Sequence, residues 1–119
     1  MAKSSQPQFV TQLAEVLSPE DVHRALLLLR GDLLRLSGDM QRAAQGRDEK
    51  AFRGATHAIC GAAGSVGVES LEQACRAAMT RHDFDGQMQA IANGIMNLVE
   101  QTLADIAVVL SAATGRPTT

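Results

Sequence analysis

The residues that could carry chemistry in this chain gather around His57. It opens the stretch HAICGAAGSVG, and it lies four residues after Arg53 and three before Cys60. In a helix these spacings put all three side chains on one side, because each residue turns by about 100°. Three glycines flank the same side: Gly54, Gly61 and Gly64. An accessible imidazole can serve as a base, a metal ligand or a nucleophile.

The glycines are costly for a helix. Each lowers helix stability by about 1 kcal/mol relative to alanine, or about 3 kcal/mol for the three together. The whole free energy of unfolding of a domain of this size is only about 5–15 kcal/mol. The cost indicates that something large approaches the ring closely. The simpler alternative is an ordinary exposed histidine beside glycines that have no role.

The surroundings of His57 favour a nucleophile over a base or a metal ligand. A general base usually needs an orienting carboxylate, and no acid lies three or four residues from His57. Cys60, Cys75 and His82 could complete a tetrahedral metal site, but the usual short ligand spacings are absent. A nucleophile that meets its reaction partner on another protein fits best, and no metal site is expected.

The elements that must position His57 are helices. Residues 9–17 have the spacing of a short helix, and Ser18-Pro19 is a typical start for a second one that runs to about residue 45. Asp48 can cap a third helix that ends at Gly67. Two more helices follow, over about residues 69–81 and, after a turn at 82–86, to about residue 113. We expect an all-α fold, an up-down antiparallel four-helix bundle with a short extra N-terminal helix.

The predicted domain covers residues 9–114, with frayed tails at 1–8 and 115–119. The second helix carries a main apolar stripe and, off that stripe, Leu27 and Leu34. This second apolar face needs a cover. We expect the short N-terminal helix to provide it, and a second copy of the chain is the alternative.

Composition excludes several classes of function. The net charge is −2 with both signs interspersed, so a nucleic-acid surface has little support. No uninterrupted apolar run approaches the roughly 20 residues of a membrane span, and no signal peptide is recognisable. The two cysteines, Cys60 and Cys75, do not form a disulfide framework. We expect a cytoplasmic domain with no membrane contact and with reduced thiols.

The region around His57 resembles the histidine-containing phosphotransfer (HPt) domains, especially those at the C-terminal end of hybrid sensor kinases. The matching positions are His57, Ile59, Gly61, Ala62, Ala63, Gly67, Leu71 and Cys75. The resemblance implies that His57 accepts a phosphoryl group from the aspartate of one receiver domain. It then passes the group to the aspartate of another, in a sensor kinase or a response regulator. The resemblance also implies that the receiver supplies Mg²⁺, and that the domain itself binds no cofactor and is not an enzyme.

One position departs from the family pattern, because Cys60 stands where HPt domains usually have a lysine that steadies the phosphoryl charge. Arg53 could replace that lysine, since a guanidinium can pair with two phosphoryl oxygens. Cys60 is expected to be exposed beside the site, and Cys60, Gly61 and Gly64 are expected to form the docking surface with Arg53. The departure also leaves open a helical domain that docks a receiver or kinase without being phosphorylated.

Overall fold

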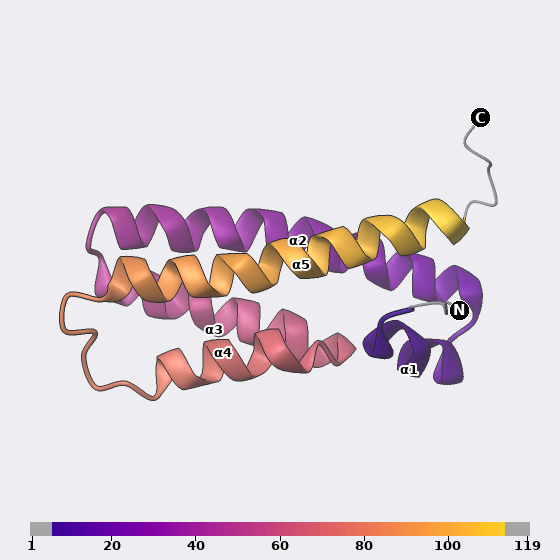
Figure 1. The fold of residues 1–119 in the computed structure, drawn as a ribbon, viewed down its shortest axis with the longest axis horizontal. Coiled ribbons are helices and arrows are strands. Elements are labelled where there is room, and N and C mark those ends of the chain that lie inside the picture. The colour runs from indigo at the N-terminus through magenta and orange to yellow at the C-terminus, as the bar shows by residue number, and fades with distance from the viewer. Residues whose placement is uncertain (1–5, 114–119) are drawn as a thin grey trace.

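The computed structural model describes residues 6–113, and in this range the chain forms five α-helices and no strand. Figure 1 shows the four longer helices lying side by side, with sequence neighbours antiparallel. α3 packs between α2 and α4, while α5 packs against α2 and α4. The helices are α1 (Gln8–Val16), α2 (Pro19–Gln45), α3 (Glu49–Val66), α4 (Glu69–Met79) and α5 (Met88–Ala113). The all-α prediction is therefore confirmed.

Local capping interactions set the predicted helix boundaries. The Ser18 hydroxyl accepts a hydrogen bond from the Asp21 amide at 3.1 Å, and Pro19 takes the first turn of α2. The Asp48 carboxylate accepts one from the Ala51 amide at 3.1 Å and so starts α3. Gly67 ends α3 in the left-handed conformation, with φ of 82°. These caps confirm the predicted starts of α2 and α3 and the end of α3.

The ends of the described chain differ slightly from expectation. α1 begins at Gln8, one residue before the predicted start, with Pro7 at its N-cap position. The predicted frayed tails fall mainly on residues 1–5 and 115–119, which lie outside the described residues. α4 ends at Met79, two residues before the predicted end.

The turn after α4 carries a core residue that the helix pattern did not reveal. Phe84 is buried, and its ring meets the Phe52 ring edge-on, with centroids 5.1 Å apart and planes at 82°. The next two residues, Asp85 and Gly86, both have positive φ and turn the chain into α5. The loop therefore closes one end of the core as well as joining two helices.

α1 does not cover the second apolar face of α2, so the prediction that it would was wrong. Its buried residues are Phe9 and Val10, and it lies at the end of the molecule where α2 begins and α5 ends (Figure 1). Leu27 remains 38% exposed and Leu34 57% exposed. The helix wheel could identify the second face but not the direction from which α1 approaches. The alternative cover, a second copy of the chain, stays a prediction.

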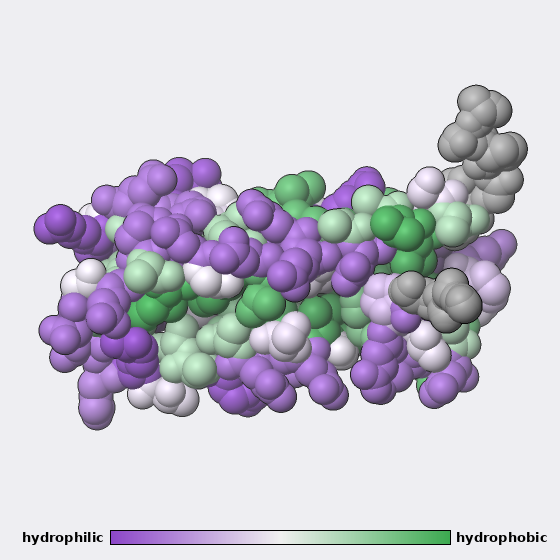
Figure 2. All heavy atoms as spheres, viewed as in Figure 1, coloured by the Kyte–Doolittle hydropathy of each residue, from purple (hydrophilic) through white to green (hydrophobic). Residues whose placement is uncertain are grey.

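α5 is more apolar than its sequence pattern indicated, because polar residues interrupt its apolar stretches without lowering its mean hydropathy much. Residues 88–112 have a mean hydropathy of 1.4 in their most apolar window, enough to cross a membrane by length and composition alone. The core helix of a soluble protein can pass the same test. One face of α5 packs into the core through Ala92, Ile95, Val99 and Ile106. Figure 2 shows apolar groups between polar ones on the side that carries this helix.

Candidate functional site

His57 lies on the outer ridge of α3, as the helix wheel predicted. Its side chain is exposed, while Phe52, Thr56 and Ile59 on the opposite side of the helix are buried. α2 packs along one flank of this ridge and α4 along the other. The imidazole ring is therefore accessible to solvent, and the described residues do not enclose it in a pocket.

The glycines beside His57 do not serve packing within the chain. A methyl group added at Gly54 or Gly61 would meet no atom within 4 Å. Gly64 is different, because an added methyl would lie 3.0 Å from a carboxylate oxygen of Glu72 on α4. Gly54 and Gly61 thus leave open space over the helix next to the ring, whereas Gly64 makes room for a neighbouring side chain.

Arg53 is engaged away from the ridge. Its guanidinium donates hydrogen bonds to the carbonyl oxygens of Met79 at 3.4 Å, Arg81 at 2.8 Å and His82 at 3.1 Å. Its Nε also pairs with the carboxylate of Glu49 at 3.0 Å. These contacts tie α3 to the C-terminal end of α4 and satisfy carbonyls that the helix leaves free. A phosphoryl group on His57 would have to displace them to recruit this guanidinium.

Cys60 is buried, so the expectation of an exposed thiol was wrong. The residue is 8% exposed, and its Sγ donates to the carbonyl oxygen of Glu72 at 3.8 Å. The reason is the packing of α4, which runs along the flank of α3 where Cys60 points. A docked partner can reach His57, Gly61 and Gly64 directly, but it meets α4 where the thiol was expected.

The second cysteine is also a core group. Cys75 on α4 is fully buried, and this burial raises the pKa of its thiol to about 12, with the nearby Cys60 acting in the same direction. Such a thiol stays protonated and unreactive at neutral pH. Across residues 6–113, no three His, Cys, Asp or Glu side chains gather into a possible metal site.

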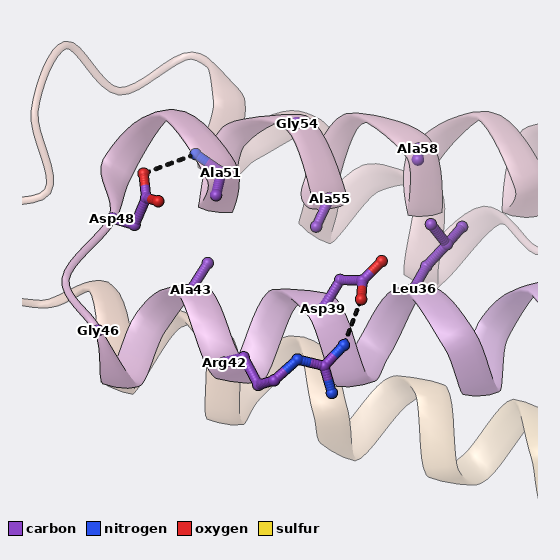
Figure 3. Close-up of a pocket in the computed structure, with 10 residues that line it drawn as sticks. All are labelled: Leu36, Asp39, Arg42, Ala43, Gly46, Asp48, Ala51, Gly54, Ala55 and Ala58. Carbon is purple, nitrogen blue, oxygen red and sulfur yellow. Dashed lines mark hydrogen bonds and ion pairs between the residues drawn. The ribbon is translucent and has the colours of Figure 1, made fainter.

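A groove runs along the other flank of the ridge, between α2 and α3. It encloses about 680 Å³ and is lined on the α3 side by Gly54 and Ala58, which adjoin His57 in the helix. Figure 3 shows Leu36 of α2 reaching toward Ala58, with the Asp39–Arg42 ion pair beside them. A protein surface placed over His57 would therefore also meet α2 across this groove.

Two residues near the ridge were missed from sequence. The carboxylate of Glu72 reaches over Gly64, and it forms an ion pair with Arg76 one turn further along α4. The signal that could have found them is the short turn at Gly67 and Val68, which makes α3 and α4 antiparallel neighbours. Counting outward from that turn places Glu72 opposite Gly64.

Comparisons with protein-family models, with curated proteins and with solved structures found no match to this chain.

Proposed function

We propose that this chain is a histidine phosphotransfer domain, in which His57 carries a phosphoryl group between receiver domains. The observation that carries the proposal is the open surface around the ring. His57 is exposed on a helix, and neither Gly54 nor Gly61 has a packing reason to lack a side chain. A receiver's active site is a concave surface on another protein, and bare backbone lets such a surface close over the ring.

The arrangement of helices supports the finer description of the fold. We interpret α2, α3, α4 and α5 as an up-down antiparallel four-helix bundle, with α1 as an extra helix at one end. Each of the four packs against two others in a ring, as the contacts α2–α3, α3–α4, α4–α5 and α2–α5 indicate. In this architecture a residue on the outer ridge of one helix is available to a partner without any rearrangement of the core.

The proposed reaction needs only the imidazole from this chain. A ring nitrogen lone pair forms the N–P bond while the P–O bond to the receiver's aspartate breaks, and that aspartate leaves as a carboxylate. The ring keeps the proton on its other nitrogen. The reverse step delivers the phosphoryl group to a second aspartate. Mg²⁺ in the receiver neutralises the phosphoryl oxygens, and this chain binds no cofactor of its own. Because the proposed partners are receiver domains of the cytoplasm, the proposal also puts this domain in the cytoplasm.

Phosphotransfer can be tested with labelled phosphate. The purified domain is mixed with Mg²⁺ and a panel of phosphorylated receivers and hybrid kinases, beside the variant His57→Gln. We expect label on the wild type alone, lost in acid and kept in alkali, as for a phosphohistidine. A folded wild type that takes no label from the whole panel would contradict the proposal.

A second candidate function is docking without phosphorylation. It is favoured by the lack of a free cation where the HPt family has its lysine, since Cys60 is buried and Arg53 is engaged. In that case the domain would bind a receiver with similar affinity whether position 57 is His or Gln, and His57 would stay unlabelled. Binding measured by titration calorimetry, run beside the labelling experiment, separates the two functions.

A further inference from the structure

A phosphoryl group on His57 would lie on a ridge whose own helix offers little positive charge. The guanidinium of Arg53 faces the end of α4, and position 60 is a buried thiol. Lys50 is on the same face of α3 but seven residues away, about 10 Å along the helix axis. The two negative charges of a phosphoryl group are most readily balanced from a neighbouring helix.

Contacts between the two helices fix the register of α4 against α3. Glu72 lies beside Gly64, and its carbonyl oxygen is 3.8 Å from Sγ of Cys60. Further along, the carbonyl oxygen of Met79 accepts from Arg53 at 3.4 Å. Because the helices are antiparallel and rise by the same 1.5 Å per residue, each step along α4 after Glu72 matches one step back along α3 from Gly64, and the long side chain of Arg53 reaches the end of α4. Position 76 therefore falls opposite about position 60, one turn from His57.

The residue at position 76 is an arginine, and its side chain points outward from α4 beside position 60 of α3. Its side chain is 62% exposed, and its guanidinium forms an ion pair with the carboxylate of Glu72. That carboxylate is only 27% exposed and lies against Gly64, where an added methyl would be 3.1 Å from its carboxyl carbon. The ion pair therefore holds the guanidinium near Gly64, on the outer side of α3 and two turns from His57. The missing side chain at Gly61 leaves the surface between Gly64 and His57 open.

We propose that Arg76 is the residue that pairs with the phosphoryl group on His57, and that in the unphosphorylated domain Glu72 holds its guanidinium back, toward Gly64. On phosphorylation the guanidinium exchanges the Glu72 carboxylate for phosphoryl oxygens, two of which it can bind at once. This inference rests on the proposed function, and it assigns to α4 the cation that α3 lacks. Glu72 then has an opposing effect, because its free carboxylate repels the phosphoryl charge.

The test uses phosphoramidate, a small donor that phosphorylates histidine without a partner protein. The lifetime of the phosphohistidine is measured at neutral pH for the wild type, Arg76→Ala and Glu72→Gln. We expect Arg76→Ala to shorten the lifetime by about three- to tenfold. Glu72→Gln should preserve or lengthen it, because the guanidinium is freed. If the ion pair had only a structural role, both variants would shift the lifetime in the same direction, and that result would contradict the proposal.

Two further variants sharpen the result. Arg76→Lys keeps the charge and should restore part of the lifetime, whereas Lys50→Ala removes an exposed cation from the same face and should leave it unchanged. The three side chains changed in these four variants are either exposed or replaced by a close relative, and circular dichroism checks that each variant is folded. An unchanged lifetime in Arg76→Ala, or a loss as large in Lys50→Ala, would overturn the inference.

The experiments distinguish a failure of the role of Arg76 from a failure of the proposed phosphotransfer function. If receivers phosphorylate His57 but Arg76→Ala behaves as the wild type, only the role of Arg76 fails. If no receiver donates a phosphoryl group but the phosphoramidate adduct depends on Arg76, the relay fails and the role of Arg76 stands. If phosphoramidate does not label His57 in the folded wild type, both are contradicted.

Discussion

The guanidinium carbon of Arg53 lies 4.4 Å from the centre of the Phe84 ring. One side chain of α3 thus holds the loop after α4 in two ways, by stacking on its buried aromatic ring and by donating hydrogen bonds to the carbonyls of Arg81 and His82. Phe84 in turn packs edge-on against Phe52, the residue before Arg53. Two consecutive residues of α3 therefore fix this end of the molecule.

Removing this tie should destabilise the fold. We expect Arg53→Ala to lower the free energy of unfolding by about 2–3 kcal/mol, because carbonyls lose a charged donor and the ring loses its cation. Urea denaturation followed by circular dichroism measures the change. Arg24→Ala is the matched control, since its 2.7 Å pair with Asp21 is exposed and should contribute less than about 0.5 kcal/mol. Equal losses in the two variants would contradict the structural role of Arg53.

Gly61→Ala should separate stability from docking. The added methyl meets no atom of the chain, so the helix should gain about 0.5–1 kcal/mol. The same methyl lies beside His57, so the rate of phosphotransfer from a receiver should fall several-fold. Gly31→Ala is the control, because its methyl also meets nothing but lies on α2. It should stabilise the domain without slowing transfer, and an equally fast Gly61→Ala would argue against close approach at that position.

Gly67→Ala should have the opposite effect on stability. Gly67 has φ of 82°, a conformation that costs alanine about 1–2 kcal/mol. An added methyl would also lie 3.4 Å from the side-chain oxygen of Gln12 on α1. Thermal unfolding should therefore show a lower melting temperature for Gly67→Ala and a higher one for Gly61→Ala. A melting temperature that rises in both would exclude the left-handed end of α3.

The buried thiol of Cys75 predicts how stability depends on pH. Burial raises its pKa from 9.0 to about 12, so the folded protein holds the proton more tightly than the unfolded chain does. This stabilisation is complete below pH 9 and is lost as the pH rises from 9 toward 12. The slope approaches about 1.4 kcal/mol per pH unit in that window.

The chain suits this measurement because it has no tyrosine and only Lys3 and Lys50 as lysines. Denaturation at a series of pH values, for the wild type and Cys75→Ala, isolates the contribution of the thiol. The variant should be less stable at pH 8 but should lose less stability between pH 9 and 11. Parallel curves for the two proteins would contradict the assignment.

Thr56 carries an unused hydroxyl in the core. Among the buried side-chain oxygen and nitrogen atoms of residues 6–113, its Oγ1 alone has no hydrogen-bond partner. A buried polar group in this state lowers stability, so Thr56→Val should raise the free energy of unfolding by about 1 kcal/mol. Ser37→Ala is a useful comparison, because the Ser37 hydroxyl bonds to the Leu34 carbonyl at 3.4 Å. A stabilised Ser37→Ala beside a destabilised Thr56→Val would reverse the expectation.

The parts of the fold that could be predicted from sequence depend on neighbouring residues along the chain. The helix ends set by Ser18, Asp48 and Gly67 depend on backbone groups within three or four residues. They could therefore be predicted from the sequence. The outward direction of His57 also followed from its own helix, because the core side of α3 is marked by Phe52 and Ile59.

The parts that could not be predicted depend on which element packs beside which. A helix wheel gives the direction of the core but not the positions of the flanking helices, and Cys60 is buried because α4 happens to lie on its side. The same limit applies to α1, whose position left Leu27 and Leu34 exposed. The sequence indicated that Arg53 is a free cation beside His57, but its guanidinium binds carbonyl oxygens at the end of α4, which no helix wheel of α3 could reveal.

The short connections around α3 have a consequence for how the molecule folds. The turns at residues 46–48 and 67–68 join α2, α3 and α4 through contacts that are close in sequence. We expect such contacts to form early because closing a short loop costs little chain entropy, whereas α5 must return to α2 over a long separation. The ridge that carries His57 belongs entirely to the early part. Substitutions in α5 should therefore mainly accelerate unfolding, while substitutions at the α3–α4 turn should slow the folding reaction itself.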